Sequence, residues 1–92
     1  MVYDIKMYVK KDCPYCDRAR NFLIKKSLNF QEIFIDIDDD PNKILYLEMY
    51  NKSGGCVTVP QIFINNYHIG GSDDLLKLEN NIKKLDYLLN RI

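Results

Sequence analysis

A strand–helix–strand pattern at the start of the chain restricts its possible folds more than any other feature. Residues 2–9 have apolar side chains at alternate positions, and residues 30–37 are again rich in β-formers. Between them, residues 14–26 carry apolar side chains at helical spacing, and Pro14 suits a first helical turn, which does not need its N–H. The sequence therefore predicts a βαβ unit. An apolar stretch at residues 33–35 predicts that the second strand is buried on both faces.

The second half of the chain changes to a hairpin. The predicted elements are a helix that begins at 38–41 and runs to about residue 52, strands over 59–64 and 67–69, and a helical segment over 72–89 with a break at Asn80-Asn81. Asn65-Asn66 lies between the two strands and is typical of a tight turn. The order βαβαββα predicts an α/β fold with a four-stranded mixed sheet flanked by helices.

Length and charge exclude several classes of protein. The chain has 92 residues, which suits a single domain over residues 1–92. Thirteen Lys and Arg residues balance thirteen Asp and Glu residues, so no net field attracts nucleic acid or anionic lipid. Asp4 and Lys6 interrupt the first apolar stretch and argue against a signal peptide, and glycines break the long uncharged stretch over 53–72. We expect a cytoplasmic monomer that contacts neither membranes nor nucleic acid.

The motif Cys13-Pro14-Tyr15-Cys16 follows the first predicted strand and opens the first predicted helix. In that position a Cys-x-x-Cys pair is typical of a redox site, because residues three apart on a helical turn can close a small disulfide without moving the backbone. Cys13 lies at the predicted helix cap, where the helix dipole favours a thiolate, and Lys10 is close in sequence. Cys13 is therefore the predicted nucleophile, and Cys16 is the predicted resolving thiol.

Two other interpretations of these cysteines stay open at this point. The cysteines could be a purely structural pair, or half of a zinc site completed by Cys56 and His68. Pro14 and the strand-to-helix setting favour the redox interpretation, and Cys56 and His68 lie on either side of a predicted strand. We expect His68 to be a structural residue and Cys56 to be a bystander thiol.

Three segments together resemble the signatures of the dithiol glutaredoxins: Cys13-Pro14-Tyr15-Cys16, Thr58-Val59-Pro60 and Gly70-Gly71-Ser72-Asp73-Asp74. Their order and spacing match too, and the similarity covers essentially the whole chain. The resemblance implies a thioredoxin-like fold and glutathione-dependent reduction of protein disulfides and glutathione mixed disulfides through Cys13 and Cys16. Glutathione would be a cosubstrate, with no tightly bound cofactor and no metal, and glutathione reductase with NADPH would recharge the protein.

The resemblance also implies a glutathione-binding set, which is Lys10, Tyr15, Thr58, Val59, Pro60, Gly71, Ser72 and Asp73. In glutaredoxins the proline is cis, and the backbone of the residue before it pairs with the cysteine of glutathione. The backbone of Ser72 and Asp73 would bind the γ-glutamyl carboxylate, and the Asp73 carboxylate would hold the ammonium group. Lys10 would pair with the glycine carboxylate, and Tyr15 would border the groove. Asp74 is expected to be a plain helix cap.

The chain departs from the family just before Thr58. Many glutaredoxins have Arg or Lys there as a second partner for the glycine carboxylate, and this chain has Cys56-Val57. The departure lends weight to a second interpretation, an electron carrier reduced by thioredoxin reductase. A third is a dimer that binds an iron–sulfur cluster through Cys13 and glutathione, although relatives of that kind usually have Gly and Ser within the motif.

Overall fold

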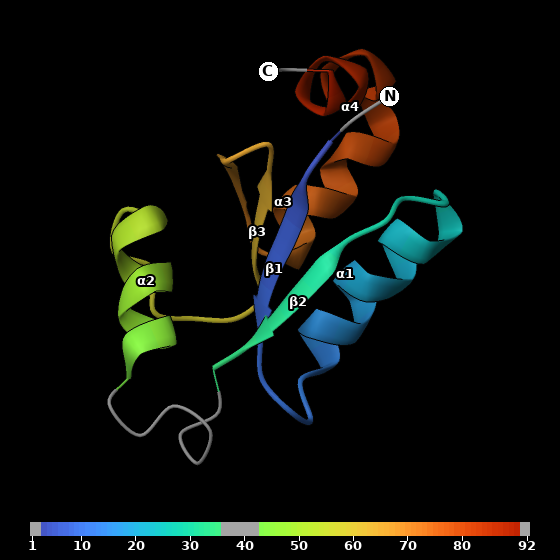
Figure 1. The fold of residues 1–92 in the computed structure, drawn as a ribbon. Helices are drawn as coiled ribbons and strands as arrows, with labels where there is room; N and C mark the ends of the chain where they lie inside the picture. The colour runs from blue at the N-terminus through green and yellow to red at the C-terminus, as the bar shows by residue number, and fades with distance from the viewer. Residues whose placement is uncertain (1–2, 36–42, 91–92) are drawn as a thin grey trace.

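The structure is a computed structural model that describes residues 3–35 and 43–90. Figure 1 shows how its helices and strands are arranged. Within the described residues the elements are β1 (Ile5–Val9), α1 (Pro14–Lys25), β2 (Gln31–Phe34), α2 (Ile44–Lys52), β3 (Gln61–Ile64), β4 (Tyr67–Gly70), α3 (Ser72–Leu76), the 3-10 helix η1 (Lys77–Asn80) and α4 (Ile82–Leu89). This order confirms the predicted succession of strands and helices.

The strands of the described residues form one mixed sheet in the order β2-β1-β3-β4. β1 and β2 are parallel, with Tyr8 opposite Ile33, so α1 is the crossover helix of a βαβ unit. β3 runs antiparallel to β1, with Tyr8 opposite Gln61, and β4 runs antiparallel to β3. The predicted α/β fold with a four-stranded mixed sheet is confirmed.

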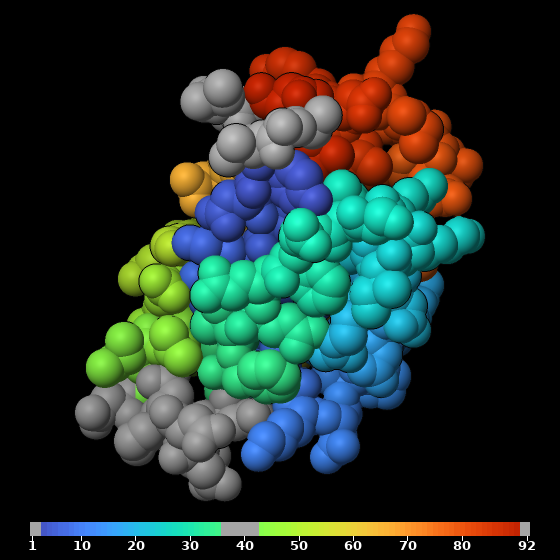
Figure 2. Space-filling view, turned by 45° about the vertical axis from the view of Figure 1, so that its right-hand side comes forward, coloured from blue at the N-terminus to red at the C-terminus, as the bar shows by residue number. Residues whose placement is uncertain are grey.

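β2 lies at an edge of the sheet, which corrects one prediction from the sequence. The apolar stretch over 33–35 predicts burial on both faces, but Ile33 is half-buried and Phe34 is 40% exposed, and only Ile35 is buried. The reason is topological, because β2 ends the described sheet and β1 is its single neighbour there. Figure 2 shows the β2 region, coloured teal to green, at the surface between α1 and α2.

The β3–β4 hairpin turns at Asn65 and Asn66, as the sequence predicts. Their φ angles are 49° and 68°, and a type I′ turn requires positive φ at both central positions. The Asn65 side chain also ties the turn to the rest of the fold. Its Oδ1 accepts from the Asp4 N–H at 2.8 Å, and its Nδ2 donates to the Leu88 carbonyl at 2.8 Å. One residue therefore joins the hairpin to the approach to β1 and to α4.

The starts of two helices agree with the sequence. α1 begins after Cys13, its predicted cap. α4 begins after the predicted break, and Asn81 caps it because its Oδ1 accepts from the Lys84 N–H at 3.2 Å. α2 begins only after Lys43, and its predicted start over 38–41 lies outside the described residues. No helix within residues 3–35 and 43–90 has both the length and the apolar character needed to span a bilayer.

Each face of the sheet has its own buried cluster. Successive strand side chains point to opposite faces, so Met7 and Ile62 enter the larger cluster, whereas Tyr8 and Phe63 enter the smaller one. The larger cluster is completed by buried side chains of α1, α3, η1 and α4. The smaller cluster includes Met49 of α2, which covers the other face of the sheet (Figure 1). The start of α1 is thereby held against a packed core.

Candidate active site

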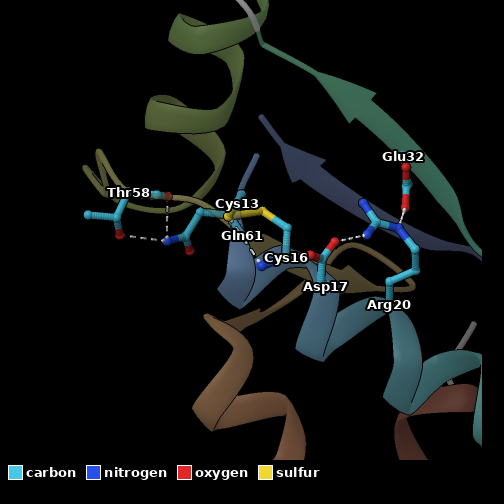
Figure 3. The surroundings of a disulfide bond; sticks show 7 residues. All are labelled: Cys13, Cys16, Asp17, Arg20, Glu32, Thr58 and Gln61. Atoms are coloured by element: carbon cyan, nitrogen blue, oxygen red, sulfur yellow. Dashed lines mark hydrogen bonds and ion pairs between the residues drawn. A yellow bond between two sulfur atoms is a disulfide. The ribbon is translucent and has the colours of Figure 1, made fainter. Parts of the chain in front are cut away.

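Cys13 and Cys16 form a disulfide at the start of α1, with their Cα atoms 5.2 Å apart (Figure 3). Cys13 is the N-cap of this helix: its carbonyl accepts from the Asp17 N–H at 3.1 Å, and its Sγ accepts from the Cys16 N–H at 3.2 Å. A capping side chain faces the free N–H groups of the first turn. The Cys13 sulfur therefore lies where the helix dipole favours negative charge.

The two sulfurs differ in their access to solvent. Cys16 is completely buried as a member of the larger core cluster, whereas Cys13 is half-buried and packs against that cluster. The difference follows from helix geometry, because the first cysteine lies at the tip of α1 and the second lies one turn further along. Of the two motif cysteines, Cys13 is therefore the one with surface exposed to solvent.

A groove of about 320 Å³ lies next to the cysteine motif. It is lined by Tyr15 of the motif, by the segment Thr58-Val59-Pro60 and by the segment Gly71-Ser72-Asp73-Asp74. Three segments that are far apart in the sequence thus meet around one hollow, whose volume is at the lower end of the range for small-molecule sites. Lys10, which follows β1 and is exposed, belongs to the predicted glutathione-binding set but does not line this groove.

The wall formed by residues 58–60 is held in place by packing. The Val59 side chain packs against both core clusters, and Pro60 is buried. The Val59–Pro60 peptide bond is cis, as the resemblance implies. Val59 is therefore anchored in the core at the point where it lines the groove.

The other wall begins at the first turn of α3. Gly71 is the N-cap of α3, and its N–H donates to Asp74 Oδ2 at 3.0 Å, so Asp74 is the helix cap that the sequence predicts. Gly70 has a φ of 121°, and a Cβ at this position would collide with the Asp74 carboxylate. Glycine is therefore required immediately before the cap. In the same turn Ser72 is buried and Asp73 is exposed.

Arg18 is a residue at this site that the sequence does not single out. Its Nη1 lies 3.3 Å from Asp73 Oδ1, and its Cζ lies 5.9 Å from the centre of the Tyr15 ring. The spacing of three between Tyr15 and Arg18 is the signal that could have found it, because such residues share one face of a helix. Exposed ion pairs of this kind contribute about 0–1 kcal/mol. Arg18 thus contacts two of the residues that line the groove, Asp73 and Tyr15.

Gln61 is a second residue that the sequence does not single out, and it connects the groove to the sheet. Its side chain is buried, and its Nε2 donates to the Thr58 carbonyl at 3.0 Å (Figure 3). Its Oε1 lies 2.7 Å from His68 Nε2. His68 is thus a hydrogen-bonded structural residue, as expected from the sequence. No pattern in the sequence could reveal this contact, because it depends on the pairing of β3 with β4.

Ionic contacts tie the first half of α1 to the edge strand. Arg20 on α1 bonds to Glu32 on β2 and to Asp17 one turn earlier (Figure 3). The hydrogen bond that Arg20 donates to the Glu32 carboxylate is the main reason that the pKa of Arg20 lies above its ordinary value. Arg20 therefore stays charged, and the ties hold the helix that carries both cysteines.

The residues of the alternative zinc site are engaged in other contacts. The two motif cysteines bond to each other, the Cys56 Sγ donates to the Ser53 carbonyl at 3.6 Å, and His68 contacts Gln61. In the part of the chain that the structure describes, no three His, Cys, Asp or Glu side chains gather in a group that could hold a metal ion. What these residues offer for chemistry is the pair of sulfur atoms at the tip of α1.

The chain is similar in sequence to known proteins over nearly its whole length. The family model for glutaredoxin matches residues 5–69. Glutaredoxin 3 of Escherichia coli (strain K12) is 46% identical over 76 residues, which cover 83% of this chain and 86% of that protein. Glutaredoxin 1 of Rickettsia typhi is 42% identical over 89 residues, which cover 97% of this chain and 82% of that protein.

Solved structures are similar as well. The solution structure of a glutaredoxin from Brucella melitensis is 40% identical, with a TM-score of 0.71, and the match covers 94% of this chain and 88% of that one. The crystal structure of a buckwheat glutaredoxin–glutathione complex is 28% identical, with a TM-score of 0.78, and the match covers 95% of this chain and 76% of that one. These matches confirm the predicted thioredoxin-like fold. Together with the disulfide of the Cys-Pro-Tyr-Cys motif, they show that the chain belongs to the dithiol class of the glutaredoxin family, which consists of thiol–disulfide oxidoreductases.

Proposed function

We propose that the protein uses glutathione as cosubstrate to reduce protein disulfides and mixed disulfides of glutathione. The observation that carries the proposal is the groove next to the cysteine motif. Apart from Lys10, every residue of the predicted glutathione-binding set lines this groove. The buckwheat relative was solved as a complex with glutathione, which supports the choice of this ligand.

In the proposed complex, glutathione lies extended along the groove. The backbone N–H and C=O of Val59 pair with its cysteine, as a neighbouring strand would. The backbone N–H groups of Ser72 and Asp73 donate to the γ-glutamyl carboxylate, and the exposed Asp73 carboxylate holds the ammonium group. Tyr15 borders the groove, and Lys10 pairs with the glycine carboxylate. The three charged groups of the tripeptide thereby each have a partner.

The proposed reaction begins at the accessible sulfur. The Cys13 thiolate attacks one sulfur of a protein disulfide, forms a mixed disulfide and displaces the other target sulfur as a thiolate. Cys16, as thiolate, then attacks the Cys13 sulfur, closes the internal disulfide and releases the second target sulfur. The target gains two electrons, and Cys13 and Cys16 lose two. With a glutathionylated target, Cys13 instead takes over the glutathionyl group and releases the target thiol.

Recharging needs two molecules of glutathione. The first attacks the Cys13 sulfur of the internal disulfide and releases Cys16 as a thiolate. The second attacks the glutathione bound to Cys13 and leaves as glutathione disulfide, which restores both thiols. Glutathione reductase with NADPH would return the glutathione disulfide to two thiols. We propose that the protein acts in this way as a cytoplasmic monomer.

The test of this proposal replaces each cysteine with serine. We expect Cys13→Ser to lower turnover of every substrate to background, because the attacking sulfur is gone. Cys16→Ser is expected to keep the reduction of glutathione mixed disulfides and to lose the reduction of protein disulfides. Cys56→Ser is the matched control and should retain both activities. The measurement is NADPH consumption coupled through glutathione reductase, and full activity of Cys13→Ser would overturn the proposal.

A second electron source is favoured by one specific residue. Val57 is 54% exposed at the position where many glutaredoxins carry a cation for the glycine carboxylate. Weaker binding of glutathione would make recharging by thioredoxin reductase comparatively more important. The rates of recharging with glutathione and with thioredoxin reductase, measured on the same oxidised protein, decide between the two.

A further inference from the structure

Gln61 is a buried polar side chain directly behind the groove. It is 4% exposed, and all of its hydrogen-bonding groups face named partners. The Nε2 donates to the Thr58 carbonyl at 3.0 Å and lies 3.4 Å from Thr58 Oγ1 (Figure 3). The Oε1 lies 2.7 Å from His68 Nε2. A buried amide with both ends engaged holds its neighbours in one arrangement.

The bond to Thr58 determines the direction of a neighbouring N–H. The Thr58 carbonyl belongs to the peptide unit whose N–H is that of Val59. This unit is trans, since the cis bond of the described residues is Val59–Pro60, and in a planar trans unit the C=O and N–H point in opposite directions. With its oxygen held by Gln61, the unit directs the Val59 N–H away from Gln61. Thr58 and Val59 both line the groove.

His68 determines which way the Gln61 amide is turned. The Thr58 carbonyl can only accept, so the amide must present its Nε2 to Thr58 and its Oε1 to His68. The His68 Nε2 therefore carries a proton and donates to Oε1. The His68 ring also lies beside the Phe63 ring, with centroids 5.0 Å apart, which fixes it over the sheet. The chain of contacts runs from β4 through β3 to the wall of the groove.

We propose that Gln61 is a positioning residue that directs the Val59 N–H toward the carbonyl oxygen of the substrate's cysteine residue. The inference rests on the proposed function, because it takes glutathione as the occupant of the groove. Gln61 itself does not touch the substrate, and it acts through the Thr58–Val59 peptide unit. Its contribution is selectivity for substrates that offer a carbonyl group beside the reacting sulfur.

Two probes that differ in this one carbonyl group test the proposal. They are mixed disulfides of one reporter thiol with γ-glutamylcysteinamide and with γ-glutamylcysteamine, which lacks the carboxamide. For the reduced native protein, we expect kcat/KM for reporter release to be about two- to tenfold higher with the first probe, the effect of one hydrogen bond. A merely structural role of Gln61 would not change this ratio, because loss of folded protein lowers both rates equally.

The informative variants remove donation to Thr58. Gln61→Met is apolar and of similar length, Gln61→Leu is apolar and shorter, and neither side chain presents a donor to the Thr58 carbonyl. In both we expect the ratio to fall to about one, while the rate with γ-glutamylcysteamine stays within about twofold of the native rate. Gln31→Met, at an exposed glutamine on β2, is the matched control and should keep the native ratio. An unchanged ratio in either folded Gln61 variant overturns the proposal.

One measurement on the native protein does not depend on the folding of a variant. The side-chain amide protons of Gln61 should exchange with solvent far more slowly than those of exposed Gln31 in an NMR exchange experiment. Equal exchange of the two would show that the bond to Thr58 is not held and would also overturn the proposal. A different result would contradict the proposed function. The native protein would then release the reporter equally fast from its mixed disulfides with γ-glutamylcysteamine and with plain cysteamine.

Discussion

Tyr8 shows how one side chain can join the sheet to a helix and make stability depend on pH. It is 1% exposed in β1, and its hydroxyl donates to Glu48 Oε2 of α2 at 2.9 Å. Burial first, and then the hydrogen bond and charge of Glu48, raise the pKa of Tyr8 far above its ordinary value. An unfolded tyrosine ionises near pH 10, so Tyr8 binds its proton more tightly in the folded chain than in the unfolded one.

The pH dependence of unfolding tests this account of Tyr8. Its contribution to stability is fully present below pH of about 10 and declines as the pH rises above that value, where only the unfolded chain releases the proton. We expect the free energy of unfolding of native protein to fall more steeply between about pH 9.5 and 11 than that of Tyr8→Phe. Tyr87→Phe, at a tyrosine that is 66% exposed, should keep the native slope. Equal slopes for all three proteins in urea denaturation would contradict the account.

At the scale of single residues, the sequence motifs predicted the pair of cysteines and the helix caps. They did not predict the side chains that contact the residues lining the groove. Cys13 and Asp74 could be assigned as caps from local sequence, because a cap acts on the turn that follows it. Arg18 and Gln61 could not, because their partners belong to other elements: Arg18 contacts Asp73 at the start of α3, and Gln61 contacts His68 across the hairpin. Such contacts depend on register and helix position, which appear only in the folded chain.

At the scale of elements, the β3–β4 turn is held by one side chain as well as by its own backbone. Asn65 accepts from Asp4 and donates to Leu88, so its side chain links three parts of the chain that are distant in sequence. Its neighbour Asn66 has the same left-handed backbone but is exposed. Both asparagines meet the backbone requirement of the turn, and Asn65 also contributes side-chain hydrogen bonds. Comparing the two positions therefore distinguishes the effect of the backbone from that of the side chain.

Glycine substitutions at the two asparagines distinguish these contributions. Asn65→Gly keeps the left-handed backbone and loses the side-chain hydrogen bonds to Asp4, Leu88 and Leu89, so we expect it to lower the free energy of unfolding by about 1–3 kcal/mol. Asn66→Gly should change it by no more than about 0.5 kcal/mol. Thermal or urea denaturation followed by circular dichroism measures both. A similar loss in the two variants would mean that the side chain of Asn65 adds nothing.

The order of the helices and strands along the chain was more predictable than how deeply each of them is buried. The βαβ pattern, the Asn65-Asn66 turn and the break before α4 all follow from local chain chemistry. The burial of β2 did not, because an apolar run looks the same in a central strand and in an edge strand whose apolar side chains remain half-covered. The number of neighbours of a strand is a property of the sheet rather than of the strand.

At the scale of the whole molecule, two clusters of different size hold the two faces of one sheet. Leu75 of α3 is completely buried in the larger cluster, and Met49 of α2 is completely buried in the smaller one. Val59 packs against both, at the wall of the groove. Since β1 and β3 contribute side chains to both faces, we expect the clusters to melt together.

Large-to-small substitutions on the two faces test this cooperativity. Leu75→Ala and Met49→Ala should each lower the free energy of unfolding by about 2–5 kcal/mol, through lost burial and the cavity that remains. In each variant, circular dichroism and tyrosine fluorescence should report one coincident transition, which is the behaviour of the single domain that the sequence predicts. Separate transitions for helix content and tyrosine environment would show that the two faces unfold independently.

The unequal burial of the two motif sulfurs also determines how the oxidised protein is opened. A reducing thiol needs a path to the sulfur that it attacks, and the core encloses Cys16 completely. We therefore expect a reductant to approach over the tip of α1 and bond to Cys13, so that the enclosed sulfur is the one expelled. On this expectation packing selects which sulfur is attacked, and the reductant reacts at the same sulfur atom from which the substrate departs.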